Sequence, residues 1–101
     1  MTEPIKTGDL AIIVEGDEIN IGIIGTVGAF YEANTLFKAN DNDPNLTGVA
    51  WSGWLLETHA QPIQLPDQFG NMNSLKRCVV PPGALKPIRG LPTKIEDEAY
   101  A

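Results

Sequence analysis

The sequence predicts a single all-β domain, built as a small barrel of five to six short strands. Two observations carry this prediction. Apolar, β-branched runs of strand length recur between turn residues, at intervals of roughly 8 to 12 positions. The 10 glycines and 8 prolines among the 101 residues punctuate these runs and disfavour long helices. A chain of this length can bury one core without disulfides or metals.

The predicted strands follow one another with turns or loops between them. Two glycines in the second strand, Gly25 and Gly28, are typical of a bulge or a sharp bend. Pro81-Pro82-Gly83 predicts a 3₁₀ turn before the last strand. The strands are expected at residues 10–14, 23–31, 49–58, 62–65, 75–80 and 86–88.

Two long connections interrupt this pattern, at residues 32–49 and 61–74. Within the first, residues 32–38 fit either a strand continuation or a helical turn, and the Asn, Asp and Pro residues of 40–45 predict a loop. We expect one domain over residues 1–90. Residues 91–101 lose periodicity and are expected to form an acidic, flexible tail.

Charge and cysteine content limit the classes of partner. Thirteen acidic against 7 basic residues give a net charge of -6, which disfavours non-specific nucleic-acid binding. The single cysteine, Cys78, lies in an apolar run, which predicts a buried free thiol and a reducing cytoplasm. No apolar run approaches the roughly 20 residues of a membrane span, and the N-terminus lacks a secretory pattern. The expected location is the cytoplasm, with no membrane partner.

The residues that could carry chemistry are too few for a recognisable catalytic or metal site. His59 is the only histidine, and no nucleophile motif accompanies it. One Cys and one His do not supply the ligands of a zinc site. Asp41, Asp43 and Asn45 have the spacing of a calcium loop, but the glycine and glutamate that complete that motif are absent. We therefore expect no enzyme, no metal and no cofactor.

Two stretches resemble a known group of proteins. Gly8-Asp9 leads into the first strand and a Gly-x-x-Gly-x-Val element, Gly22 to Val27, begins the second; together they resemble the opening of SH3-like barrels of the KOW type. The ending, residues 78–89, is similar to the close of small SH3-like proteins of bacterial and prophage genomes. The resemblance implies an SH3-like barrel, a phage or prophage association, and an interaction or accessory role, since most of those proteins have no assigned function.

Aromatic residues are the candidates for binding a protein partner. Trp51 and Trp54 are three positions apart, so on one regular strand they face opposite sides, and one can fill the core while the other emerges. An exposed tryptophan is a good interface anchor. The alternative is that the long segment 32–49 covers the outward one. The candidates are Trp51, Trp54, Tyr31 and Phe37, and the same surface would serve a homo-oligomer.

Two other functions remain as alternatives. Lys76, Arg77, Lys86 and Arg89 place four of the seven basic residues within fourteen positions. On a barrel with nearby aromatic residues, such a cluster is suited to bind single-stranded nucleic acid. A small enzyme that uses His59 in a pocket is the second alternative.

Overall fold

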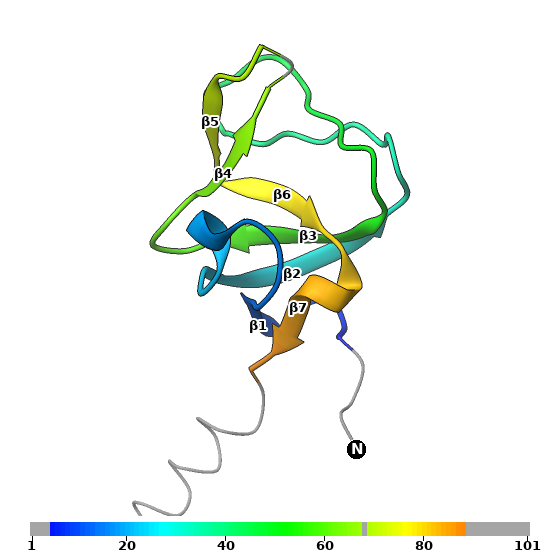
Figure 1. Ribbon diagram of the computed structural model, residues 1–101. Helices are drawn as coiled ribbons and strands as arrows, with labels where there is room; N and C mark the ends of the chain where they lie inside the picture. The colour runs from blue at the N-terminus through cyan, green and yellow to red at the C-terminus, as the bar shows by residue number, and fades with distance from the viewer. Residues whose placement is uncertain (1–4, 68, 89–101) are drawn as a thin grey trace, which may run out of the picture.

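A computed structural model describes residues 5–67 and 69–88 of the chain, and Figure 1 shows their arrangement. This part of the molecule is built of seven β-strands and two 3₁₀ turns. The all-β class and the 3₁₀ turn before the last strand are confirmed. The elements are β1 (Leu10–Ile13), η1 (Glu18–Asn20), β2 (Ile24–Tyr31), β3 (Gly53–Thr58), β4 (Ile63–Pro66), β5 (Met72–Leu75), β6 (Arg77–Val80), η2 (Pro82–Ala84) and β7 (Leu85–Pro87).

The strands form two antiparallel sheets. Five of them lie in the order β6-β3-β2-β1-β7, and β4 and β5 form a separate hairpin. The last strand pairs with the first, with Lys86 opposite Ile12. The register between β2 and β3 shifts between Val27 and Phe30, which is the kind of irregularity that the glycines of this segment predicted. Figure 1 shows the hairpin and the long loop at one end of the molecule, and β1 and β7 at the other.

Two of the expected strands have wrong bounds. The segment 75–80 is not one strand, because Lys76 separates β5 from β6, and these two strands belong to different sheets. The strand count is therefore seven. The strand expected from residue 49 begins only at Gly53, so Trp51 precedes β3 and the alternation argument does not apply to it. Arg89 and the expected tail 91–101 lie outside the described residues.

The core lies between the five-stranded sheet, the hairpin and the long loop. Its largest fully buried side chains, Leu56, Val27, Val79 and Cys78, come from β2, β3 and β6. Phe37 reaches the core from the long loop, where an isolated bridge to Thr47 holds it. The described part of the chain contains no helix of the length and apolarity that crossing a membrane requires.

Candidate functional site

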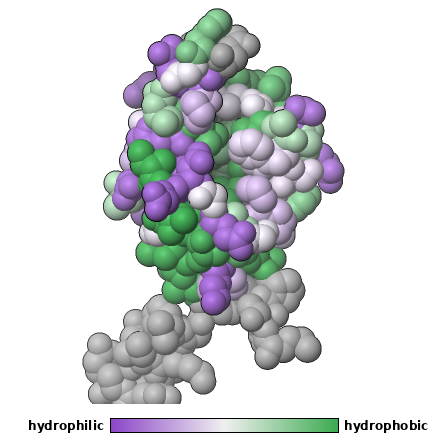
Figure 2. Space-filling view, viewed as in Figure 1, coloured by the Kyte–Doolittle hydropathy of each residue, from purple (hydrophilic) through white to green (hydrophobic). Residues whose placement is uncertain are grey.

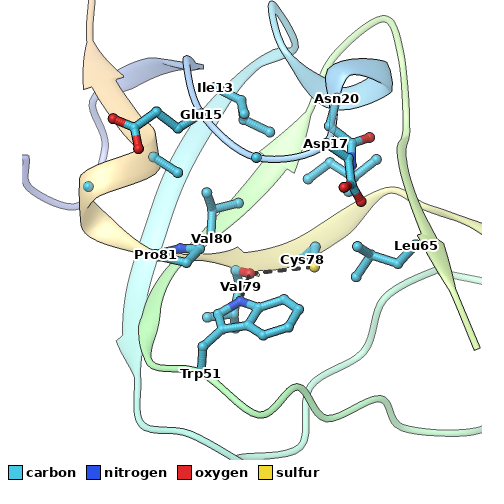
Figure 3. A pocket seen from close by; sticks show the side chains of 14 residues that line it. Ile13, Glu15, Asp17, Asn20, Trp51, Leu65, Cys78, Val79, Val80 and Pro81 are labelled. Carbon is cyan, nitrogen blue, oxygen red and sulfur yellow. Dashed lines mark hydrogen bonds between the residues drawn. The ribbon is translucent and has the colours of Figure 1, made fainter.

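A mainly apolar pocket of ≈ 440 Å³ lies between β6, Trp51 and the loop that follows β1. In Figure 3 this loop, which carries Glu15 and Asp17, lies on one side of β6 in the view, and Trp51 lies on the other. We call it the Trp51 pocket. Its apolar lining comes from Ile13, Trp51, Ile63, Leu65, Cys78, Val79, Val80, Pro81 and Ala84.

A hydrogen bond to the backbone of β6 fixes the position of the Trp51 side chain. Its indole Nε1 donates to the carbonyl oxygen of Val79 at 2.8 Å, as Figure 3 shows. The residue remains 38% exposed, so part of it still faces solvent. A tryptophan held in this way offers a rigid apolar surface with little entropy left to lose on binding.

The charged groups around this pocket are all acidic. Glu15 and Asp17 line it, and the lining contains no lysine, arginine or histidine. Neither carboxylate takes part in an ion pair with another described residue. An apolar pocket edged by uncompensated carboxylates has a negative potential at its mouth.

A second and more polar hollow, of ≈ 920 Å³, adjoins the first. The two share Asp17, Trp51 and Leu65 in their linings, so they lie side by side, and we refer to both together as the depression. Figure 2 shows the molecular surface hollowed between the hairpin and the long loop, with hydrophobic residues at the bottom. We call this second part the polar hollow.

The carboxylates of the polar hollow are held in defined positions by backbone groups. Asp67 Oδ1 accepts hydrogen bonds from the N–H groups of Phe69 at 2.8 Å and Asn71 at 2.9 Å. The hydrogen bond from Asn71 is the main reason that the pKa of Asp67 is lowered. Asp43 Oδ1 accepts from the N–H of Asn45 at 2.9 Å. No basic residue lines this hollow either.

Cys78 lies in the Trp51 pocket but is not a candidate nucleophile. The thiol is buried, and burial raises its pKa to about 12. The reactive form of a cysteine is the thiolate, which is scarce at neutral pH when the pKa is so high. Cys78 therefore acts as an apolar lining residue, and the prediction of a buried free thiol is confirmed.

The structure does not bring the four predicted aromatic candidates together. Trp51 lines the pocket, whereas Trp54 packs edge-on against Phe30 with ring centroids 5.4 Å apart. Phe37 is 4% exposed and packs edge-on against Tyr31 at 6.2 Å. Phe37 thus belongs to the core, and it has almost no surface to offer a partner.

The predicted basic cluster is divided and partly neutralised. Lys76 Nζ lies 3.2 Å from Asp41 Oδ2, and Arg77 forms ion pairs with Asp41 and Glu57. Lys86 lies on β7, which is the other edge strand of the sheet from the β6 strand of Arg77. Two of the four cations therefore have carboxylate partners, which weakens the nucleic-acid alternative.

His59 has one side-chain hydrogen-bond partner. Its Nε2 lies 2.7 Å from Thr26 Oγ1 at an exposed position. No ion pair joins His59 to a carboxylate of the described residues. Within residues 5–67 and 69–88, no three His, Cys, Asp or Glu side chains are grouped as a metal site would require.

Sequence reasoning missed the acidic loop that lines the Trp51 pocket. The sequence alone gives residues 15–18 no role beyond a turn after the first predicted strand. The signal that was present is their composition, since three of the four are acidic in a connection of a small β domain, where binding residues concentrate. Comparisons of the chain with protein-family models, curated proteins and solved structures found no match, so membership of the SH3-like group stays a prediction.

Proposed function

We propose that this protein is a non-enzymatic interaction module that holds a short segment of a partner protein in the Trp51 pocket. The observation that carries the proposal is the combination of an apolar pocket with a partly exposed tryptophan whose indole is held by the Val79 carbonyl. Binding sites are typically concave and mainly apolar with a few placed polar groups. Tryptophan is among the residues that contribute most to binding energy.

The backbone groups at the sheet edges are largely paired already, which favours binding through side chains over addition of a partner strand. An extended peptide can join a sheet only where an edge strand offers free N–H and C=O groups. On β7, Pro87 has no N–H, and the N–H of Leu85 bonds to the carbonyl of Pro82. On β6, Ala39 accepts from the N–H of Arg77, and the Val79 carbonyl is taken by Trp51.

The edges of the hairpin are covered in the same way. The side chain of Asn20 bonds to both backbone groups of Gln64 on β4. The side chain of Asn40 bonds to the carbonyl of Ser74 on β5 and to the N–H of Lys76. With these backbone groups already paired, the Trp51 pocket is the better-suited surface for a partner.

The test is to map where short peptides bind. We would screen a library of short peptides by amide chemical shifts of the labelled protein, and repeat the titration with Trp51→Ala, Trp51→Phe and Trp54→Phe. Peptide-induced shifts are expected at Val79, at Cys78 and at the Trp51 indole N–H. Trp51→Ala should abolish binding, Trp51→Phe should weaken it, and Trp54→Phe should leave it unchanged.

Two results would count against this proposal. One is a set of bound peptides whose shifts map outside the pocket. The other is unchanged affinity for Trp51→Ala, provided that its dispersed amide spectrum shows that the variant is folded.

A further inference from the structure

We infer that the segment held by the Trp51 pocket is cationic: an apolar side chain enters the pocket, and a flanking lysine or arginine lies over the polar hollow. This inference rests on the proposed function, because it names the chemistry of the partner of the same site. It follows from the charges around the depression and from the position of Trp51 within it.

The carboxylates of the depression have no positive partner within the described part of the chain. Four of them line its two parts: Glu15, Asp17, Asp43 and Asp67. The described ion pairs involve only two other acids, Asp41 and Glu57, with Lys76 and Arg77. Lys76 and Arg77 are thus paired with acids outside the depression, and no described ion pair reaches the four carboxylates that line it.

The arrangement of the two parts suits one extended segment. Trp51 and Asp17 line both the apolar pocket and the polar hollow. A partner segment that places an apolar side chain in the Trp51 pocket and continues past the indole brings its next side chains over Asp43 and Asp67. A guanidinium or ammonium group there meets fixed carboxylates and lies near an aromatic ring that attracts cations.

Charge also favours a basic segment over a second copy of this chain or a nucleic acid as the occupant of the depression. A second copy of the chain has the same net charge of -6 and would bring carboxylates toward carboxylates. Nucleic acid would bring phosphates to the same surface. Both contacts are repulsive, whereas a basic segment is attracted over a distance of about one Debye length, ~10 Å at 0.1 M salt.

The experiment compares three synthetic peptides that share one apolar centre. They are acetyl-Gly-Lys-Leu-Val-Lys-Gly-amide and its analogues with both lysines replaced by glutamine or by glutamate. Titrations by calorimetry and amide shifts are done at 50 and 300 mM salt. We expect the lysine peptide to bind roughly tenfold more tightly than the glutamine peptide, the glutamate peptide to bind weakest, and the lysine peptide to lose this advantage at 300 mM salt.

Variants of the protein test which carboxylates cause the preference for the lysine peptide. The double variant Asp17→Asn/Asp43→Asn should reduce binding of the lysine peptide and leave the glutamine peptide unaffected. Glu32→Gln, an exposed carboxylate outside both linings, is the matched control and should change neither.

Equal affinity of the lysine and glutamine peptides, with both dependent on Trp51, would overturn this inference while the proposed function stands. If none of the three peptides binds, the inference that the depression holds a short basic segment is overturned. Self-association that Trp51→Ala abolishes, seen by light scattering, would assign the pocket to a second copy instead. A gel shift with single-stranded DNA that the same variant abolishes would assign it to nucleic acid.

Discussion

Asn20 pairs with Gln64 through both ends of its side-chain amide. Its Nδ2 donates to the Gln64 carbonyl at 2.9 Å, and its Oδ1 accepts from the Gln64 N–H at 2.8 Å. The two residues are 44 positions apart, and Asn20 is 6% exposed. The amide thus supplies β4 with the hydrogen bonds of a neighbouring strand, and it fixes the hairpin that contributes Ile63 and Leu65 to the Trp51 pocket.

Replacement of Asn20 tests this connection. Asn20→Ala leaves the N–H and C=O of Gln64 without their partners; a fully buried group left so costs about 1 to 3 kcal/mol, and these part-buried bonds cost less than the upper limit. We expect the free energy of unfolding in urea to fall by roughly 2 to 4 kcal/mol. The exposed Asn42→Ala is the control and should change it by less than about 0.5 kcal/mol. Equal stabilities of the two variants would contradict the assignment.

Gly53 is expected to tolerate no side chain. A Cβ at this position would collide with the backbone carbonyl of Val80 on the paired strand. Overpacking of this kind costs about 1 to 3 kcal/mol or more, and backbone atoms move less readily than side chains. Thermal unfolding should show a large loss of stability for Gly53→Ala. Gly83→Ala, where nothing lies within 4 Å, should unfold near the temperature of the parent protein.

Cys78 should react slowly while the protein is folded. Burial raises its pKa from 9.0 to about 12, which lowers the thiolate fraction at pH 8 by about 1,000-fold. Alkylation with iodoacetamide, followed by mass spectrometry, should be slower by at least this factor in buffer than in 6 M guanidinium. A comparable rate in the two conditions would mean that the thiol is accessible and ionises normally.

The ion pairs of Asp41 predict an acid-dependent stability. Hydrogen bonds from Arg77 and then Lys76 lower the pKa of Asp41 below 3.8. The ionised form is therefore favoured in the folded state, and its contribution to stability is present above pH 3.8 and lost as the pH falls through the lowered pKa. Urea unfolding between pH 5 and 2 should show a smaller pH dependence for Asp41→Asn than for the parent. The same pH dependence for both proteins would contradict this role of Asp41.

Local patterns in the chain predicted much of the fold. The β-branched runs mark most strands within a few residues, because alternating burial and turn residues act over short distances. Pro81-Pro82-Gly83 predicted the 3₁₀ turn of η2 because proline fixes its own backbone angle. The segment 75–80 was misjudged because nothing local distinguishes one continuous strand from two strands that join different sheets.

The sequence by itself determined that the protein is an all-β domain, acidic, with a buried cysteine and without a recognisable catalytic motif. Only the tertiary structure decided where a partner can be held. The Trp51 pocket joins Glu15, Trp51 and Val79, and the cations Lys76 and Arg77 meet Asp41 across 35 and 36 positions. Such contacts depend on strand order and register, which arise when distant segments pack together and which no local pattern contains.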